Sequence, residues 1–468
     1  MVRFKELKST YIYPLFFTIV LILIVFQYQF SFLESVFYDL RIRADLGINF
    51  SDNIVLITQD DESDEFLGES YPYTYAGHSR MIDKVFLDSP SVVTYFSELS
   101  GATTKSEQEH QAEFKKKINN YKKNGGEFIF AAAMDLWGTQ LPPEYLRDLE
   151  YSYSLINKDN LAFSRDNVVR RALINISGED TLHLNVANKF RAKINKQTIS
   201  TTDIQGAYYV PEADATFSLF RYYTSPDVSN GLIKKISFHN VLVGNFPKHF
   251  FKDKIVLIGP SYISNSSDFV LTPFKKEGVG VSKLMVHAEI IQSLVENKTI
   301  LAIPKFISKM LAILIAIILF VVISRASPVR GLLIVVSSTI FLFLISYILF
   351  VIFGLWLYVT HVLFTVIGIY YIWVPFRAIS EYQTRFAIEE ESKLLKKVES
   401  LKQNFISLMS HDLKTPVAKI ATMSDVLKHK YSDNHDLSDG LNSIIDSTKE
   451  LNKFITSILD LTKIESQN

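Results

Sequence analysis

Charged residues are absent from two long stretches of the chain, and this pattern separates membrane segments from aqueous ones. Residues 11–33 and residues 331–376 contain no Asp, Glu, Lys or Arg. A helix needs about 20 apolar residues to cross a hydrocarbon layer roughly 30 Å thick. The first stretch therefore predicts one membrane span, and the second predicts two, at 331–353 and 355–376, with a turn near Gly354.

A shorter apolar run predicts a further span at 304–324. The aliphatic stems of Lys305 and Lys309 can lie along this helix while their ammonium groups reach the headgroups. A cleaved signal peptide is the alternative interpretation of 11–33, but that stretch is long and lacks a small-residue cleavage pattern before Glu34. The prediction is one span before a large polar region and three spans after it.

Basic residues predict the orientation of these spans. They occur before the first span, in the short loop after the second and after the fourth, whereas the turn between the third and the fourth has none. Residues 1–10 and the segment after residue 376 are therefore expected in the cytoplasm, and residues 34–303 outside it. The basic residues that mark the cytoplasmic side are Arg3, Lys5, Lys8, Arg325, Arg330, Arg377 and Arg385.

Composition narrows the classes of function. Lys plus Arg and Asp plus Glu each number 49 among 468 residues, so net charge gives no support for a nucleic-acid partner. No cysteine is present, which excludes disulfides, thiolate catalysis and cysteine-ligated metal centres. Hydrophobic residues make up 48% of the chain, as expected for a multidomain membrane protein.

The polar region 34–303 is long enough for a substantial core, and its pattern predicts an α/β domain. Short runs of β-branched and aromatic residues alternate with amphipathic helical segments, which indicates a largely parallel sheet covered on both faces. The predicted strands are 54–58, 92–96, 128–132 and 254–258, and the predicted helices are 107–123 and 284–296.

After residue 376 the sequence becomes charged and helix-favouring, with an apolar position every three or four residues. This spacing predicts a coiled-coil linker at 377–403, which continues without a breaker into a helical hairpin at 404–468. Two amphipathic helices cannot bury both apolar stripes alone, so we expect a homodimer with a four-helix bundle. The apolar positions are Leu394, Val398, Leu401, Phe405 and Leu408 in the first helix, and Leu437, Leu441, Ile444, Leu451, Phe454, Ile455, Ile458 and Leu459 in the second.

The first helix of this hairpin carries a chemically suggestive motif at residues 410–416. His411 stands beside the carboxylate of Asp412, and the hydroxyl of Thr415 follows one helical turn later. These groups combine a nucleophile, a base and a group able to orient water, which favours phosphotransfer. Pro416 lacks a backbone donor and predicts a bend in the helix. The alternative is an exposed histidine on an ordinary coiled coil, with solvated charges around it.

Residues 405–416, together with the hairpin that ends at 459–465, resemble the HisKA-type dimerisation and phosphotransfer domain of sensor histidine kinases. The resemblance implies that His411 accepts the terminal phosphoryl group of ATP and that Asp412 acts as general base. It also implies that Thr415 positions water for phosphatase activity, and that a response regulator is the partner.

The outer region resembles the second type of CHASE domain, a sensory module of bacterial receptors that is typically followed by three membrane helices. The resemblance covers about residues 34–375. Two features depart from the family pattern. Residues 71–73 replace the proline-tryptophan stretch usual after the first strand, and Ser97 stands where an aspartate is expected after the second strand. The sequence segments that carry the resemblance are 38–43, 60–63, 166–171, 254–259, Asp268 with 272–273, and 287–289.

Two sets of outer residues are candidates for ligand binding. Asp60 and Asp61, with neighbouring acidic residues, could offer oxygen atoms to a hard cation, and Arg170 with Arg171 could clamp a carboxylate or phosphate. The alternatives are a solvated loop and structural salt bridges. His287 has no second ligand at helical spacing, so no metal site is predicted.

These observations predict a multi-pass sensor histidine kinase of the bacterial cytoplasmic (inner) membrane, acting as a homodimer with an unidentified extracellular ligand. The sequence to Asn468 holds no phosphate-cradling loop, so ATP and Mg²⁺ are expected to act through a further ATP-binding domain, and this chain is expected to be inactive alone. One alternative is a non-catalytic receptor or phosphorelay member that a separate kinase phosphorylates. Another is a transporter or membrane enzyme, for which His361 and scattered hydroxyls are the available intramembrane polar groups.

Overall fold

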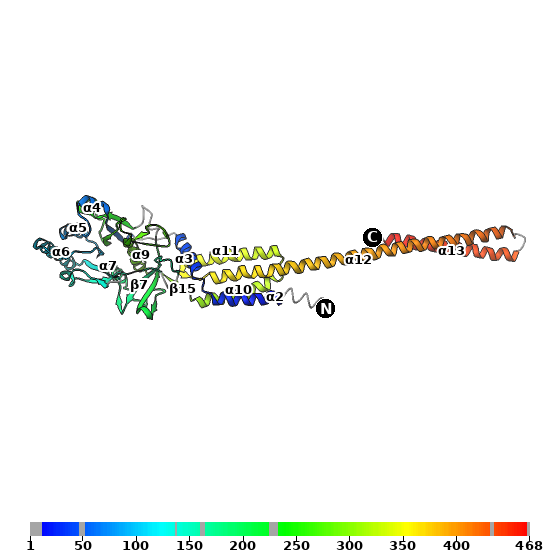
Figure 1. Ribbon diagram of the computed structural model, residues 1–468, viewed down its shortest axis with the longest axis horizontal. Coiled ribbons are helices and arrows are strands. Elements are labelled where there is room, and N and C mark those ends of the chain that lie inside the picture. Colours follow the sequence, from blue (N-terminus) through cyan, green and yellow to red (C-terminus); the bar gives the residue numbers. More distant parts are fainter. Residues whose placement is uncertain are drawn as a thin grey trace. The chain divides into compact units, whose positions relative to one another are not determined.

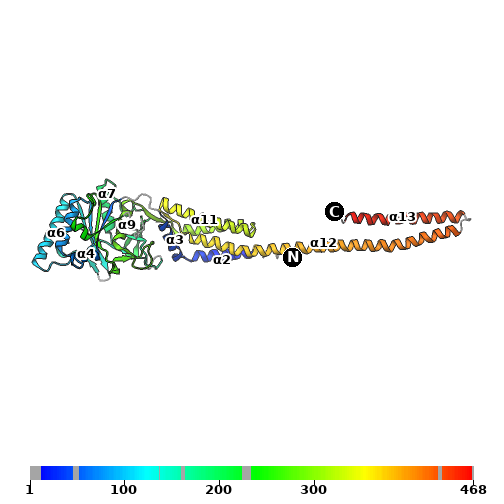
Figure 2. The same cartoon turned by 90° about the horizontal axis from the view of Figure 1, so that it is seen from above.

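The computed structural model describes residues 12–45, 52–135, 138–159, 164–223, 233–430 and 435–465. The chain divides into two compact units, one formed by residues 13–373 and the other by residues 1–12 with residues 374–468. The first unit contains the α/β domain and the apolar helices, and the second contains a long helical hairpin (Figures 1 and 2).

A seven-stranded sheet forms the centre of the α/β domain. Its strands β11, β1, β12, β2 and β3 lie side by side in that order and are all parallel; β5 also pairs with β3 in parallel, and β4 pairs with β3 antiparallel. The predicted parallel sheet is thus confirmed. The strands are β1 (Ile54–Gln59), β2 (Val92–Tyr95), β3 (Glu127–Asp135), β4 (Gly138–Gln140), β5 (Tyr151–Tyr153), β11 (Lys234–Ser237) and β12 (Ile255–Pro260).

Helices cover both faces of this sheet (Figure 1). Alternate strand residues face opposite sides, so that Ile54 and Leu56 of β1 pack in one core and Val55 and Ile57 pack in another. The first core includes α7 (Leu182–Lys193) and α9 (Lys283–Val295), whereas the second includes α5 (Tyr75–Leu87), α6 (Lys105–Lys123) and α8 (Phe238–Val243). The short helices α4 (Asp61–Leu67), η2 (Glu144–Leu146), η3 (Pro211–Ala213) and η4 (Ser266–Asp268) occur in the connections.

A second, mostly antiparallel sheet has the strand order β16, β15, β10, β7 and β6. Its edge strand β16 comes from the loop between two apolar helices and pairs in parallel with β15. This loop was expected to be a turn leading directly into a membrane helix. The strands are β6 (Ile156–Asn157), β7 (Arg171–Ile176), β8 (Glu179–Asp180), β9 (Tyr208–Val210), β10 (Ala215–Phe220), β15 (Thr299–Ala302) and β16 (Leu355–Trp356), and a separate ribbon joins β13 (Phe269–Val270) to β14 (Val281–Ser282).

Among the described residues, three helices are long and apolar enough to cross a membrane, or four spans result if a bent pair of helices counts as one. The bent pair is α2 (Tyr13–Gln27) and α3 (Ser31–Ala44), which meet at 74°. The chain therefore turns sharply within the predicted span 11–33. The other three are α10 (Lys305–Ile323), α11 (Pro328–Phe353) and α12 (Thr360–Lys430), the last of which begins five residues later than expected because β16 precedes it.

The apolar helices enclose a core of their own. Ala312 and Leu319 of α10, Leu342 of α11 and Val362 of α12 are buried together. Trp373 of α12 is also buried there, and its indole N–H donates to the Thr18 hydroxyl of α2 at 3.1 Å. Outward-facing side chains of these helices are large, apolar and exposed, as lipid-facing positions are.

From Val374 onward the second unit is a helical hairpin. α12 continues to Lys430, and α13 (His435–Glu465) runs back beside it (Figures 1 and 2). The helical assignment of α12 includes both Pro375 and Pro416. Val417 and Ile455 are buried between the two helices, but most other apolar residues of the hairpin are exposed.

Candidate functional site

His411 lies on α12 within the helical hairpin, and its side chain is 83% exposed. The preceding residue, Ser410, is only 5% exposed and faces the interior of the hairpin. Neighbouring helix positions point about 100° apart, so burial of Ser410 directs His411 outward. The His411 imidazole is thus accessible to an incoming molecule, while the neighbouring Ser410 packs inside the hairpin.

Asp412 lies next to this imidazole. The His411 Nδ1 atom is 3.5 Å from Asp412 Oδ1, which is long for a hydrogen bond but within reach of one after a small side-chain rotation. Asp412 is itself 76% exposed. Because the carboxylate faces Nδ1, the Nε2 atom is the ring nitrogen that remains available to an electrophile.

Thr415 extends this surface by one helical turn. Its hydroxyl donates to the His411 carbonyl at 3.2 Å, as hydroxyls in helices commonly do. His411, Lys414 and Thr415 line one end of a groove along α12, whose floor is apolar. The structure therefore places His411 and Thr415 on the same groove of α12, with Asp412 beside the imidazole.

Apolar residues beside this surface are largely exposed within the described part of one chain. Leu408 and Met423 of α12 are 66% exposed, and Phe454 of α13 is 64% exposed. A two-helix hairpin has too little interior to bury such a stripe. A second hairpin would cover it and form a four-helix bundle.

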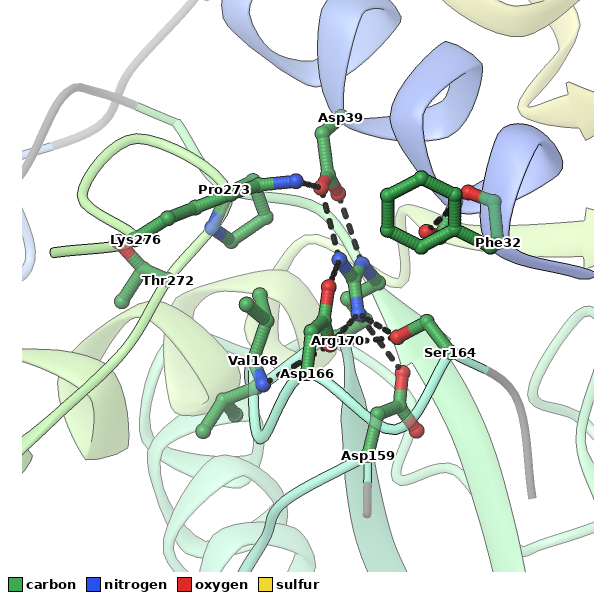
Figure 3. Close-up of polar contacts among 12 residues, drawn as sticks. Phe32, Asp39, Asp159, Ser164, Asp166, Val168, Arg170, Thr272, Pro273 and Lys276 are labelled. Atoms are coloured by element: carbon green, nitrogen blue, oxygen red, sulfur yellow. Dashed lines mark hydrogen bonds and ion pairs between the residues drawn. The ribbon is translucent and has the colours of Figure 1, made fainter. Parts of the chain in front are cut away.

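In the first unit, Arg170 forms the most buried ionic cluster of the described α/β domain (Figure 3). Its guanidinium is 0% exposed, and it donates to both carboxylate oxygens of Asp39 at 2.7 Å. It also donates to Asp166 at 2.6 and 2.9 Å, to Asp159 at 3.3 Å and to the Ser164 hydroxyl at 3.0 Å. All three guanidinium nitrogens of Arg170 therefore donate hydrogen bonds within the protein.

The cluster holds α3 against the α/β domain, because Asp39 belongs to α3. Lys276 reinforces it from a third segment, with Nζ 2.5 Å from Asp39 Oδ2. Although burial alone lowers the pKa of Arg170, its bonds to Asp39 and Asp166 raise it above the ordinary value. Burial raises the pKa of Asp166, but bonds from Arg170 and Ser164 outweigh it and hold that pKa at about 2.

These contacts favour the structural alternative for Arg170. Arg171 lies at the edge of the same cluster, with its Nε 3.5 Å from Asp159 Oδ1 and its guanidinium over the Tyr208 ring. For Asp159, burial outweighs both arginines and raises the pKa. Both predicted arginines therefore join segments of the domain together.

Asp60 and Asp61 also make contacts within the domain. Asp60 caps α4: it accepts from the Ser63 amide at 3.0 Å and from the Thr58 hydroxyl at 2.8 Å. Asp61 accepts from the Ile263 amide and the Ser264 hydroxyl, and so holds the loop after β12. Within the described ranges, no three His, Asp or Glu side chains are grouped so that they could hold a metal ion.

Glu34 makes a second connection between α3 and the chain beyond it, which the sequence analysis missed. This carboxylate is 1% exposed and accepts from the Val359 and Thr360 amides, the Thr360 hydroxyl and the Trp356 indole. It thereby caps the first turn of α12 from another helix. The sequence signal was present: Glu34 and Asp39 are acidic residues that directly follow the first apolar stretch.

Comparisons with known families agree with this division of the chain. Residues 17–323 match the model of the CHASE2 domain, and residues 401–467 match that of the His Kinase A (phospho-acceptor) domain. Searches of the curated proteins and of the solved structures gave no match. The first match covers well over half of the 468 residues. The chain therefore belongs to the CHASE2 family, and its additional phospho-acceptor domain indicates a two-component sensor histidine kinase.

Proposed function

We propose that the protein senses an extracellular signal with residues 34–303 and is phosphorylated from ATP on His411 in the cytoplasm. The observation that carries the proposal is the arrangement of His411 and Thr415 on the same groove of α12, with Asp412 beside the imidazole. The first turn of that helix is capped by Glu34 beside the α/β domain, so one helix extends from the sensor side to the phosphoacceptor. The apolar helices would anchor the protein in the bacterial cytoplasmic membrane, with both its N-terminus and the hairpin inside.

The geometry supports a direct phosphoryl transfer. Nε2 of His411 attacks the terminal phosphorus of ATP, an N–P bond forms, and the bond to the ADP oxygen breaks. Asp412 takes or orients the Nδ1 proton as positive charge develops on the ring, a role that its position 3.5 Å away supports. The phosphoryl group then passes to an aspartate of a response regulator, and the imidazole is restored.

The same surface supports dephosphorylation of the response regulator. Thr415 lies one turn beyond His411, where its hydroxyl can orient a water molecule against a phosphorylated aspartate held near the imidazole. Hydrolysis of that acyl phosphate releases inorganic phosphate. We assign ATP and Mg²⁺ to an ATP-binding domain that docks on the hairpin, since ATP is the substrate and phosphotransfer needs Mg²⁺.

Homodimerisation completes this site. The exposed apolar stripe through Leu408, Met423 and Phe454 supports a four-helix bundle of two hairpins. His411, which lines the same groove as Met423 and is 83% exposed in one hairpin, would lie at the edge of that interface, where it stays accessible to ATP.

The test supplies the full chain in detergent micelles with a purified histidine-kinase ATP-binding domain and radiolabelled ATP. Acid-labile, base-stable label is expected on the chain and should be lost in His411→Gln. His429→Gln is the matched control, because His429 is exposed on the same helix and should leave labelling unchanged. Label that persists in His411→Gln would refute the proposal.

A further inference from the structure

A cavity of about 830 Å³ lies at the carboxyl edge of the parallel sheet. Its walls come from the segment after β2, the second half of β3, the last residue of β12 and the first turns of α9. Open parallel sheets bind ligands at this edge, outside the carboxyl ends of their strands. The volume lies within the range of small-molecule sites.

The walls combine apolar and polar surface in nearly equal measure. Phe96, Phe130 and Leu155 line the apolar part. At the polar end are Lys283 and Lys158, neither of which forms an ion pair with any carboxylate in the described ranges. An apolar body with one charged end would match both parts.

Lys283 is half-buried, and its ammonium makes no ion pair with a carboxylate of the described residues. Burial lowers its pKa, and the nearby ammonium of Lys158 lowers it further, while Asp268 acts in the opposite direction. The Asp268 carboxylate already accepts from the Tyr262 amide at 3.1 Å and from the Asn265 side chain at 3.2 Å. No carboxylate of the described residues lies within ion-pair distance of either lysine, so an anion placed between them would supply a direct partner for both ammonium groups.

The start of α9 adds to this positive field. Lys283 is its first residue, its first turn contains no acidic residue, and the Ser282 side chain makes no capping bond. The amide groups at a helix N-terminus carry partial positive charge and favour an anion. Lys283 and Leu284, the first two residues of α9, both line the cavity.

His287 adds a largely buried imidazole to the same wall. It is 5% exposed and lies one helical turn after Lys283, and its Nδ1 is hydrogen-bonded to Nε2 of the buried His183 at 2.8 Å. The other ring nitrogen, Nε2, makes no hydrogen bond within the described residues. Burial lowers the pKa of both histidines, to about 4 for His183, so the pair is neutral without ligand.

We propose that this cavity binds a small organic anion, a carboxylate on an apolar or aromatic body, as the signal molecule. Its carboxylate would lie between Lys283, Lys158 and the start of α9, and its body would lie against Phe96 and Phe130. Glu98, the remaining carboxylate of the wall, is exposed at the rim. The binding step stands on the cavity alone, whereas its role as a signal rests on the function proposed above.

The cavity has a direct structural connection to the membrane helices. α9 begins at the cavity wall and leads at its other end into β15, which continues into α10. β15 also pairs with β16, the strand that precedes α12. A ligand that shifts the first turn of α9 toward the cavity would therefore move a helix that is connected through β15 to α10 and α12.

The test measures binding to the full chain in detergent micelles by isothermal titration calorimetry. The probes are benzoate, 3-phenylpropionate and hexanoate, each compared with its neutral amide. At least one acid is expected to bind saturably with a Kd of about 1 mM or below, and its amide about tenfold more weakly or not at all. Binding of no acid up to about 10 mM, or equal binding of acid and amide, would overturn the proposal.

Variants locate the site and separate the two proposals. Lys283→Met should weaken binding of the acid about tenfold, whereas Lys252→Met should not, because Lys252 is exposed and lies outside the cavity wall. The unfolding temperature of each ligand-free variant shows that it is folded. His411→Gln should bind the acid like the unaltered chain, so loss of phosphorylation leaves this result standing. Unchanged binding in Lys283→Met refutes the assignment.

Discussion

Replacement of Arg170 by methionine tests whether the buried cluster holds α3 on the α/β domain. The change keeps a long unbranched side chain but removes the guanidinium and all its hydrogen bonds. Asp39 and Asp159 are 2% and 1% exposed as side chains, so neither can recover its lost partner by moving into water. Lys276 remains near Asp39, and Arg171 remains near Asp159.

The expected loss of stability is about 3–5 kcal/mol, the usual result when one member of a buried ion pair is removed. The guanidinium makes two bonds to Asp39, two to Asp166 and one to Asp159, which favours the upper half of that range. For a domain of this size the loss corresponds to a fall in unfolding temperature of about 6–20 °C.

The measurement is thermal unfolding of the full chain in detergent micelles, followed by tryptophan fluorescence. Trp356 is a suitable reporter, because its ring packs against Tyr38 of α3 with centroids 4.7 Å apart. Lys234→Met is the control, since it breaks an exposed ion pair with Asp52 that is worth below about 1 kcal/mol. If both variants unfold within a degree or two of the unaltered chain, the cluster does not stabilise the domain and the reasoning fails.

Three further predictions concern the hairpin and the acid stability of the sensor. Thr415→Ala should retain labelling of His411 but release phosphate from a phosphorylated response regulator at least about tenfold more slowly, because the water-orienting hydroxyl is gone; an unchanged release rate would contradict this. Phe454→Glu should shift the chain from dimer to monomer in sedimentation, because it places a charge in the expected bundle interior, and a persistent dimer would argue against that interface. Asp166 has its pKa held at about 2 against an ordinary value of 3.8, so its contribution is present above about pH 4 and is lost as the pH falls to about 2. The unfolding temperature should fall over that window, and less steeply in Asp166→Asn.

The parallel sheet was predictable because its strands are local apolar runs. Residues 54–58 and 92–96 were expected as strands, and β1 and β2 occupy Ile54–Gln59 and Val92–Tyr95. The buried pattern of each strand on both faces is visible in its own sequence. The motif around His411 was equally local, since all its residues lie within two helical turns.

The second sheet was not predictable in the same way. Its strands are short and gain their stability from partners far along the chain, as β16 does from β15, some fifty residues earlier. Structural salt bridges were one of the two interpretations of Arg170, but its partner could not be identified from the sequence, because Asp39 lies 131 residues before it. A pair of adjacent arginines in a sequence predicts charge, and burial decides whether that charge meets a ligand or the protein itself.

The strand β16 and the cap formed by Glu34 set the boundaries for any chimeric receptor built from this protein. A junction near residue 303 would leave β16 without β15 and would separate Glu34 from the Thr360 amide that it caps. The exchangeable cassette therefore extends from Tyr13 to Trp373, the limits of the first compact unit. A foreign output domain joined after Trp373, in register with α12, would receive the sensor with its membrane helices and their connections intact.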